Sequence, residues 1–585
     1  MAGATKPGLN RYLPILNWGR QYRAAQFTDD LLAAVIVSVM LVPQSLAYAL
    51  LAGLPPEMGL YASILPLMVY AVFGTSRSLS VGPVAVVSLM TAAAVARLEL
   101  ADAAQVIAAS TLLAMMAGLF LVLLGLLRLG FLANFLSHPV IAGFITASGV
   151  IIALGQLPGI LGIEAGGQTL MQLLPSLVAG FQSAAGSLNW PTITVGVGTL
   201  AYLLWAKRYL AALLVRFGLN QRLAVILSRL SPIVAVVATA VAAWSLDLGN
   251  RGLALVGDVP AGLPALSLPV MDSELWLALA GSAALIAILG FVESVSVAQG
   301  LAARRRERID PDQELIGLGA SNMAASFAGG FPVAGGFARS VVNFDAGAAT
   351  PAAGLLAAIL MGLATFFLMP LLAWLPKATL SATIIAAVLS LVDFSIVKKA
   401  WQYSRADFLA VCSTILLTWL EGVEAGVAAG IIVSILVHMY KSSRPHVAIV
   451  GQVPGTEHYR NVERHEVITY DTILSLRVDE SLYFANSRYL EDLIYREVAE
   501  RPALQHVVLM CSAVNEIDLS ALESLEAINS RLADNGIRLH LSEVKGPVMD
   551  ALETTHFLQA LSGQVYLSQH QAISDLQRST AIATP

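Results

Sequence analysis

Arg339 is the side chain whose type and setting point most directly to chemistry. It stands in the stretch GGFARSVVNF (335–344) of a chain that is 57% hydrophobic and only 12% charged. A guanidinium carries a permanent charge and several planar donors that match the oxygens of an oxyanion. An arginine at membrane depth costs several kcal/mol, so we expect it to have a function. The alternative is that Arg339 merely pairs with Glu293 or reaches an interface.

Two short apolar segments are interrupted by glycine and proline: SLSVGPVAVVSLM (78–90) and FPVAGGFARSVVNFD (331–345). Each predicts a strand that leads into a short helix, and we expect the glycines to let the backbone turn there. A helix of about ten residues covers roughly 15 Å, half of the hydrocarbon core, so both pieces must lie inside protein and line a cavity. Their amino-terminal ends, which carry partial positive charge and free N–H groups, would face each other and suit an anion.

Three further polar side chains lie within predicted spans. Glu293 must be paired or protonated at this depth, which makes it a candidate for proton coupling. Pro43 interrupts the first span just before Gln44, and Gln44 and Tyr48 are four residues apart, so both project from one helix face. They could donate to an oxyanion, or they could form hydrogen bonds between helices of the bundle.

The composition indicates an integral membrane protein with a second domain of soluble type. Long apolar stretches dominate up to about Tyr440, and charges recur every few residues from Lys441 onward. The charged fraction of the whole chain is about half that of an ordinary soluble domain. The expected parts are a cytoplasmic amino-terminal segment (1–29), a transmembrane domain (30–440), a linker (441–466) and a folded tail (467–580).

A cleaved signal peptide, a disulfide framework and a nucleic-acid partner all lose support at this stage. The first thirty residues contain no apolar core of signal-peptide type, so we expect no cleavage. Two cysteines exclude a disulfide framework, and a net charge of −5 does not suggest a nucleic-acid partner. The run RRRER (304–308) is interpreted as a topology anchor rather than as a site for nucleic acid or anionic lipid.

About fourteen crossings of roughly 20 residues fit into the apolar region. The predicted spans are 30–51, 59–73, 82–96, 103–127, 131–155, 190–206, 231–246, 275–299, 313–329, 336–346, 352–374, 378–392, 406–420 and 424–440. Lysine and arginine concentrate in the loops on one side. The positive-inside rule places that side, the amino terminus and the tail in the cytoplasm, as in a multi-pass protein of the inner (plasma) membrane.

The broken segments occupy the third position in each of two sets of seven spans, about residues 30–246 and 275–440. Sequence echoes support a repeat: LSHPVIAGFITA (136–147) resembles LPKATLSATIIA (375–386). Because seven is odd, the second copy must be inverted relative to the first. Interrupted segments at matching positions of inverted halves point to a substrate site near the midplane of a secondary transporter.

The tail alternates predicted strands and helices and indicates a small α/β domain. Strands are predicted at 473–478, 506–514 and 537–544, and helices at 519–536 and 547–561. Asp518 is the expected cap of the first of these helices. The histidines show no metal-ligand spacing and no Walker-type loop occurs, so neither a metal cofactor nor an ATP-driven pump is expected.

These segments resemble the SulP/SLC26 anion permeases of the bacterial sulfate permease type. The resemblance rests on LVPQSLAYALLAGLPPEMGLYAS (41–63), GTSRSLSVGPVAVVSLM (74–90), FVESVSVAQ (291–299) and GGFARSVVNFDAGAATP (335–351). The tail resembles a STAS domain. The resemblance implies a UraA/SLC26-like polytopic α-helical membrane fold of fourteen transmembrane segments in two inverted seven-span repeats, with core and gate domains and a cytoplasmic STAS domain. It also implies a homodimer in which the core moves against the gate like an elevator.

The resemblance further implies site residues. The anion site of the family corresponds to Gln44, Tyr48, Val84, Ala85, Phe337, Ala338 and Arg339. Glu293 matches the glutamate of proton-coupled sulfate transporters. Many members have serine where this chain has Ala338, so backbone N–H groups must contribute more of the binding. Ser520 corresponds to the phosphorylated loop of anti-sigma-factor antagonists, and the alternative is an ordinary first-turn serine.

We therefore expect a secondary active transporter, not an enzyme, that takes up a small oxyanion without a bound cofactor. Sulfate with protons is the leading combination; bicarbonate or a dicarboxylate is the alternative substrate and sodium the alternative coupling ion. A different class is a membrane-anchored regulator whose STAS domain binds a cytoplasmic partner. Transport retained after deletion of residues 450–585 would count against that class.

Overall fold

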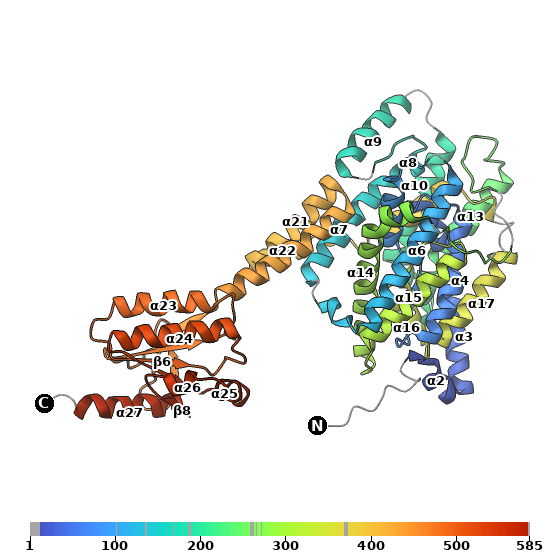
Figure 1. Ribbon diagram of the computed structural model, residues 1–585. Coiled ribbons are helices and arrows are strands. Elements are labelled where there is room, and N and C mark those ends of the chain that lie inside the picture. Colours follow the sequence, from blue (N-terminus) through green and yellow to red (C-terminus); the bar gives the residue numbers. More distant parts are fainter. Residues whose placement is uncertain are drawn as a thin grey trace. The chain divides into compact units, whose positions relative to one another are not determined.

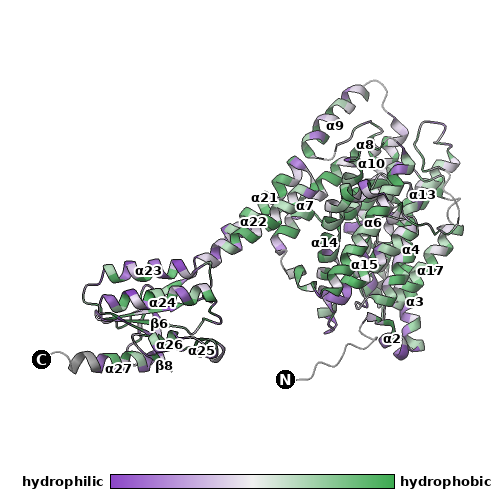
Figure 2. Ribbon diagram, in the orientation of Figure 1, coloured by the Kyte–Doolittle hydropathy of each residue, from purple (hydrophilic) through white to green (hydrophobic). Residues whose placement is uncertain are grey.

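Helices occupy nearly all of the apolar part of the chain, as its hydropathy dictates (Figures 1 and 2). The computed structural model describes residues 12–100, 102–134, 137–167, 169–184, 189–257, 262–264, 266–270, 272–367 and 372–582. The chain divides into two units, Met1–Ser434 and Ile435–Pro585. The first is helical apart from one short strand pair, and the second is an α/β domain.

Every predicted span contains a helix. The helices of the first unit, with one π-helical turn at Ala206–Leu210 and 3-10 turns at Gly19–Gln21 and Gly130–Asn134, are α2 (Ile15–Trp18), α3 (Ala24–Leu51), α4 (Pro56–Phe73), α5 (Ala85–Ala96), α6 (Ala103–Leu126), α7 (His138–Gly155), α8 (Leu157–Leu161), α9 (Leu170–Ala184), α10 (Trp190–Trp205), α11 (Ala211–Arg216), α12 (Gln221–Arg229), α13 (Ser231–Ser245), α14 (Ser273–Arg304), α15 (Pro311–Phe327), α16 (Phe337–Ala346), α17 (Ala352–Phe367), α19 (Lys377–Val388), α20 (Ser395–Tyr403), α21 (Arg405–Glu421) and α22 (Val423–Ser443). Among the described residues, six helical segments are long and apolar enough to cross a membrane by length and composition. The count of fourteen crossings stays a prediction.

Local sequence signals set the helix ends. Asp102, Asp272 and Asp310 cap α6, α14 and α15 by accepting hydrogen bonds from backbone N–H groups of the first turn. Gly347 follows α16 with a φ of 98°, which an L side chain rarely adopts, so glycine at this position ends the helix after ten residues. The short helix predicted from the broken segment is therefore present.

The two broken segments meet in the middle of the first unit. Strand β1 (Val81–Gly82) pairs antiparallel with β2 (Ala334–Gly335), with Val81 opposite Gly335. Helix α5 follows β1 and α16 follows β2, so the two helices leave the strand pair in opposite directions. This is the arrangement that an inverted repeat requires.

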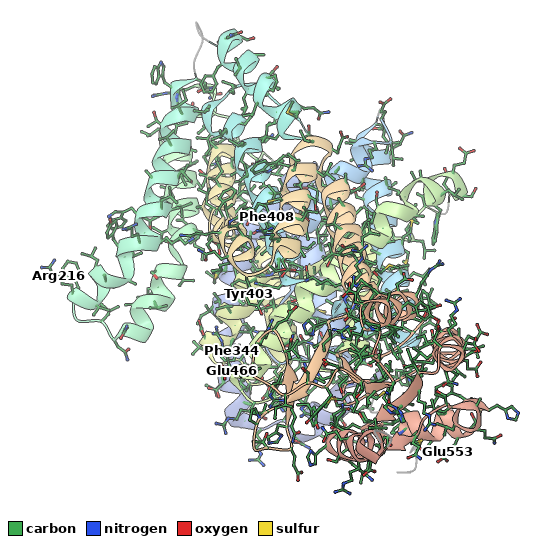
Figure 3. All side chains as sticks on the ribbon, turned by 90° about the vertical axis from the view of Figure 1, so that its left-hand side faces the viewer. Arg216, Phe344, Tyr403, Phe408, Glu466 and Glu553 are labelled. Carbon is green, nitrogen blue, oxygen red and sulfur yellow. The ribbon has the colours of Figure 1, made fainter. Side chains whose placement is uncertain are left out.

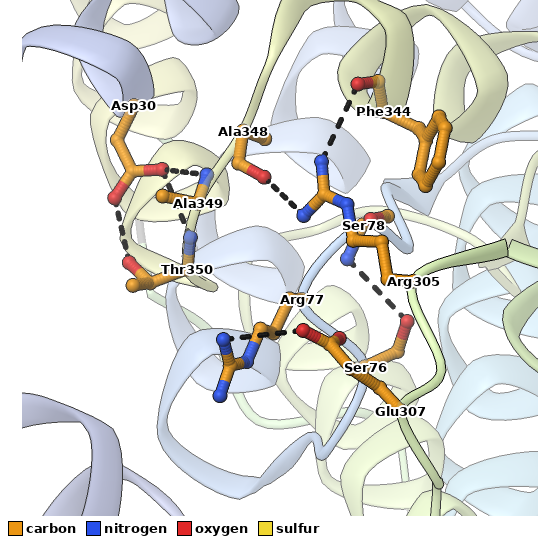
Figure 4. A network of polar contacts seen from close by, with 10 residues as sticks. All are labelled: Asp30, Ser76, Arg77, Ser78, Arg305, Glu307, Phe344, Ala348, Ala349 and Thr350. Atoms are coloured by element: carbon orange, nitrogen blue, oxygen red, sulfur yellow. Dashed lines mark hydrogen bonds and ion pairs between the residues drawn. The ribbon is translucent and has the colours of Figure 1, made fainter. Parts of the chain in front are cut away.

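A buried carboxylate ties α3 to the turn between α16 and α17 (Figure 4). Asp30 on α3 is fully buried and accepts hydrogen bonds from Ala349 N (2.6 Å), Thr350 N (3.0 Å) and Thr350 Oγ1 (2.6 Å). Tyr22 also donates its hydroxyl to this carboxylate at 3.1 Å. Asp30 thereby satisfies backbone groups of a turn that would otherwise be buried without partners.

Arg305 caps the carboxyl end of α16 (Figure 4). It lies just after α14 and donates to Ala348 O at 2.6 Å and Phe344 O at 3.4 Å. Its guanidinium also lies 4.5 Å from the ring centroid of Phe344. A cation at this end of a helix is stabilised by the helix dipole, so both ends of α16 are fixed, one by Arg305 and one by the strand pair.

The second unit is a six-stranded sheet in the order β4-β3-β5-β6-β7-β8, in which β5 to β8 are parallel. Its elements are β3 (Val447–Gln452), β4 (Tyr459–Asn461), β5 (Ile473–Val478), α23 (Ser487–Ala499), β6 (His506–Met510), α24 (Leu519–Asp534), β7 (Arg538–Ser542), α25 (Gly546–Glu553), α26 (Phe557–Ala560), β8 (Val565–Tyr566) and α27 (Gln569–Ile582). Along β6, Val507 and Leu509 pack with α23 and α24, whereas Val508 packs with α27. The alternation buries both faces of the central strand.

The structure corrects the predicted boundary of the tail. Residues 441–466 are not a linker, because α22 continues to Ser443 and β3 and β4 belong to the sheet. The helix predicted at 547–561 is two helices, α25 and α26, separated at residues 554–556. Helices α2, α8, α9, α11, α12, α20, α23 and α27 were not predicted.

Replacement of Asp30 by asparagine should destabilise the first unit. The carboxamide keeps the size of the side chain but turns one acceptor into a donor that faces Thr350, so about 1 to 3 kcal/mol of stability should be lost. Thermal unfolding of the purified full chain measures this as a lowered Tm. The matched control is Asp29→Asn, an exposed neighbour; equal Tm values for the two variants would contradict the role of Asp30.

Candidate anion-binding site

The amino-terminal ends of α5 and α16 form the centre of the site. The cap positions, Val84 and Gly336, are extended and neither makes a side-chain capping bond. The helical ladders start with Ser88 N to Val84 O and Ser340 N to Gly336 O. In the described part of the chain, no partner is present for the N–H groups of the first turns, which are those of Ala85, Val86, Val87, Phe337, Ala338 and Arg339. Two positive helix ends with free donors are a binding arrangement for an anion.

Arg339 bridges the two broken segments. Its side chain is 2% exposed, and it donates from Nη1 to Pro83 O at 2.6 Å and from Nη2 to Ala334 O at 3.3 Å. The Nε–H group is buried without a partner among the described residues. The guanidinium therefore places a full positive charge beside the starts of both helices and keeps its Nε–H donor without a partner in the described chain.

Two glycines make room for this guanidinium. A Cβ at Gly336 would lie 2.8 Å from Nε of Arg339, and a Cβ at Gly82 would lie 3.3 Å from Nη1. The φ of Gly336 is −80°, which any residue adopts. The sequence analysis expected this glycine to let the backbone turn, and that reason was wrong. Glycine is needed here because Arg339 approaches the backbone too closely for a side chain.

Four small polar side chains fix the strands that precede the helices. Ser294 on α14 accepts from Gly335 N at 2.8 Å, and Asn322 on α15 bonds both Val333 N and Val333 O at 2.9 Å. On α16, Ser340 accepts from Ser80 N at 3.0 Å and Asn343 donates to Ser78 O at 3.1 Å. Sequence reasoning missed all four. The available signal was their position beside the broken segments in otherwise apolar spans.

The predicted site residues fall into two groups. Val84 and Ala85 are buried at the start of α5, and Phe337 and Ala338 are exposed at the start of α16. These four residues and Arg339 therefore lie next to the β1–β2 pair, where α5 and α16 begin; we call this place the crossing. Gln44 and Tyr48 are half-buried on α3, which packs against both α5 and α16. Neither side chain forms a hydrogen bond with a described residue, so no interhelical bond of the alternative kind is present there.

Glu293 lies one residue before Ser294, on the helix that holds β2. It is half-buried and forms no ion pair with Arg339 within the residues that the structure describes. The alternative in which Arg339 pairs directly with Glu293 is not present in this conformation, in which Arg339 donates to two backbone carbonyls.

Two other buried carboxylates had no counterpart in the sequence analysis. Glu314 on α15 accepts from Tyr70 OH (2.7 Å), Thr75 N (2.7 Å), Thr75 Oγ1 (2.6 Å) and Ser76 N (3.1 Å) and thereby fixes the chain that leads to β1. Glu424, in the first turn of α22, pairs with Arg97 after α5 and accepts from Ser282 of α14 at 2.9 Å. These carboxylates connect helices rather than face the crossing.

The second unit shows no metal centre. In the described ranges no group of three or more His, Cys, Asp or Glu side chains could hold a metal ion. His506 and His540 contact each other at 3.1 Å (Nδ1 to Nε2) inside the sheet. Burial, the neighbouring His506 and Arg538 lower the pKa of His540 to about 4, so its ring is neutral in the folded domain. Ser520 is exposed in the first turn of α24, next to the cap Asp518, which accepts from Ala521 N at 2.8 Å.

The fold and the site define a membrane anion carrier with a STAS domain, and the chain belongs to the sulfate permease family. The family model "Sulfate permease family" matches residues 27–414, and the STAS domain model matches residues 464–572. Among relatives, sulfate transporter 4.1, chloroplastic, of Arabidopsis thaliana is 35% identical over 96% of this chain and 80% of that protein.

Two solved structures share the fold. Murine solute carrier 26 family member A9, an anion transporter in the inward-facing state, superposes with a TM-score of 0.87 at 23% identity and covers 99% of this chain and 96% of that chain. The transmembrane domain of the cyanobacterial bicarbonate transporter BicA gives 0.59 at 24% identity over 69% of this chain and 98% of that chain. This chain is accordingly a multi-pass membrane protein of the SulP/SLC26 type.

Replacement of Gly336 by alanine should weaken anion binding at least tenfold. The added methyl group would displace the guanidinium of Arg339 from Pro83 O, a change of more than about 1.4 kcal/mol in binding free energy. Sulfate-dependent thermal stabilisation of the purified chain measures the affinity. Gly354→Ala is the control, since its Cβ meets its nearest neighbour, Leu67 Cδ2, at an ordinary 3.6 Å. Wild-type sulfate affinity in Gly336→Ala would refute the close-packing argument.

Proposed function

We propose that this chain takes up sulfate together with protons, as a secondary active transporter that works by elevator-type alternating access. The observation that carries the proposal is that α5 and α16 both begin beside the buried charge of Arg339, with six first-turn N–H groups that have no partner among the described residues. Such a donor-rich site with a fixed positive charge suits a small anion with several oxygen acceptors.

Sulfate is the preferred substrate for two reasons. Relatives that cover nearly the whole chain are named sulfate transporters. The site also presents backbone donors and no side-chain hydroxyl at Ala338, an arrangement that favours an anion made only of acceptor oxygens over bicarbonate, which also carries a donor. Bicarbonate remains the second candidate because the BicA transmembrane domain shares the fold.

The packing of the helices supports a moving site. The strand before α16 is bonded to α14 and α15 and pairs with the strand before α5, so α5, α14, α15 and α16 would move as one body. The connection of this body to α22 includes the ion pair of Arg97 with Glu424 and the bond from Ser282. In the proposed cycle these contacts break and re-form as the body slides past α22.

The proposed setting follows from charge and from the family. We place the protein in the inner (plasma) membrane, with the amino terminus and the STAS domain in the cytoplasm, because lysine and arginine concentrate on that side. The protein would act as a homodimer, and the STAS domain would bind a cytoplasmic partner, with Ser520 as a candidate regulatory residue.

Reconstituted protein should import labelled sulfate, and Arg339→Gln should reduce this uptake at least tenfold. The substitution removes the fixed charge and the two bonds to Pro83 and Ala334, each worth about 1.5 to 3 kcal/mol as charge-assisted hydrogen bonds. Uptake into liposomes is measured in the presence of unlabelled sulfate, bicarbonate or fumarate. Arg251→Gln, an exposed loop residue, is the control. Stronger competition by bicarbonate or fumarate than by sulfate would overturn the substrate assignment.

Uptake should rise as the outside pH falls, and Glu293→Gln should abolish this dependence. A carboxylate beside the crossing can accept a proton when an anion binds, whereas the amide stays neutral at every pH. The measurement is initial sulfate uptake across a pH series, with and without sodium. A pH profile that is unchanged in Glu293→Gln, or uptake that requires sodium at every pH, would exclude the proposed coupling.

A further inference from the structure

Helix α20 is a short helix that links two predicted spans in the second half of the first unit. It covers Ser395–Tyr403, between α19 and α21, and its nine residues are roughly 14 Å long, too short to cross a bilayer. Ile396 and Ala400 are 9% and 5% exposed and pack with Ala147, Val411 and Ile415 of α7 and α21. One face of α20 is thus fixed against the transmembrane helices.

The opposite face combines aromatic and basic side chains. Phe394, Lys398 and Trp401 follow one another at spacings of four and three residues, so they lie on one stripe. Phe394 is 50%, Trp401 59% and Tyr403 93% exposed, and Lys398 and Lys399 are both exposed. Tyr403 and Phe408, at the junction of α20 and α21, are labelled in Figure 3.

This stripe is held rigidly. The Trp401 ring packs edge-on against Phe408, with 4.7 Å between the ring centroids. The turn before α20 is tied to α7, because Thr146 Oγ1 and the backbone of Asp393 exchange hydrogen bonds of 3.2 Å. The carboxylate of Asp393 accepts from Ser395 N and Ser395 Oγ. Lys399 attracts the carboxylate of Asp393 electrostatically, but neither Lys398 nor Lys399 is within ion-pair distance of a carboxylate in the described part of the protein.

We propose that α20 lies in the headgroup layer of the membrane and that Lys398 and Lys399 bind the phosphate of an anionic phospholipid. Three observations lead to this partner. The ends of the apolar helices α19 and α21 place α20 near the edge of the hydrocarbon layer. Tryptophan and tyrosine favour that depth, because one end of the ring is apolar and the other polar. The lysines can extend along the apolar boundary and present their ammonium groups to phosphates.

An acidic protein surface is the competing partner, and the aromatic residues disfavour it. Phe394 and Trp401 share a stripe with Lys398, so a partner must accept large apolar area and negative charge together. The headgroup layer offers both, with acyl chains below and phosphates above. The lipid contact is independent of the transported anion, so it is tested without any substrate.

The test uses the full chain in phosphatidylcholine vesicles that contain a trace of dansyl-labelled phosphatidylglycerol or dansyl-labelled phosphatidylcholine. Energy transfer to dansyl is compared between wild type and Trp401→Phe, which isolates the contribution of Trp401. We expect this contribution to be larger with phosphatidylglycerol. The preference for phosphatidylglycerol is the ratio of the Trp401 contribution with labelled phosphatidylglycerol to that with labelled phosphatidylcholine. In Lys398→Gln/Lys399→Gln this ratio should fall about fivefold for each lysine removed, since each contributes about 1 kcal/mol near an anionic surface.

The controls separate local contact from general charge and from misfolding. Lys207→Gln/Arg208→Gln removes two adjacent exposed charges elsewhere in the same unit and should leave the preference unchanged. Lys398→Arg/Lys399→Arg should retain it. An unchanged preference in the glutamine variant, or an equal loss in the control pair, overturns the proposal. Absence of a phosphatidylglycerol preference in the wild type also overturns it and favours an acidic protein partner. The lipid measurement uses no sulfate, so the proposed lipid contact is judged separately from the proposed sulfate transport.

Discussion

The buried guanidinium of Arg339 is the interaction on which the site depends. A charge at this depth needs hydrogen-bond acceptors, and here Pro83 O and Ala334 O, one from each broken segment, accept from two of its donors. The bond to Pro83 O joins the halves of the inverted repeat at the point where their helices are interrupted, and the bond to Ala334 O holds the arginine against its own segment. Gly82 and Gly336 follow from this geometry, because a side chain at either position would approach the guanidinium too closely. One side chain thus connects the repeats and supplies the charge of the site.

Each interrupted helix leaves backbone N–H and C=O groups without partners inside the helix. The groups on the strand side of the interruption and those on the helix side differ in what they bond to. On the strand side, Ser294, Asn322, Ser340 and Asn343 bond the exposed N–H and C=O groups. On the helix side, the N–H groups of the first turns of α5 and α16 have no protein partner in the described chain. Unsatisfied donors in a membrane interior cost several kcal/mol each, so their concentration in one place indicates where a bound anion contributes most. This asymmetry, rather than Arg339 alone, defines the site.

The sequence was sufficient for the helices and insufficient for the contacts. Long apolar runs predicted the helices of the first unit, because membrane helices must satisfy their backbone internally and need a fixed length. The short helix from Phe337 to Ala346 followed from glycine and proline at its start. The partners of Arg339 could not be predicted, because Pro83 is 256 residues away and only the folded strand pair brings the two together. Strands β3 and β4 were missed because they precede the alternating part of the tail and pair with each other across a loop, so their place in the sheet depends on pairing and not on local pattern.

The distribution of buried carboxylates indicates which contacts are rigid and which can change. Asp30 and Glu314 are fully buried and accept several hydrogen bonds each from turns that lead to α17 and β1, so removal of either would leave buried donors unpaired. Glu424 differs, because its partner Arg97 is 54% exposed. A half-exposed ion pair contributes about 1 kcal/mol or less, since water screens it and competes for both groups. Glu424 also lies in the first turn of α22, where the helix end stabilises a carboxylate without Arg97. The contacts of Asp30 and Glu314 are therefore costly to break, whereas the contact between Arg97 and α22 is not, and relative movement should occur at the latter.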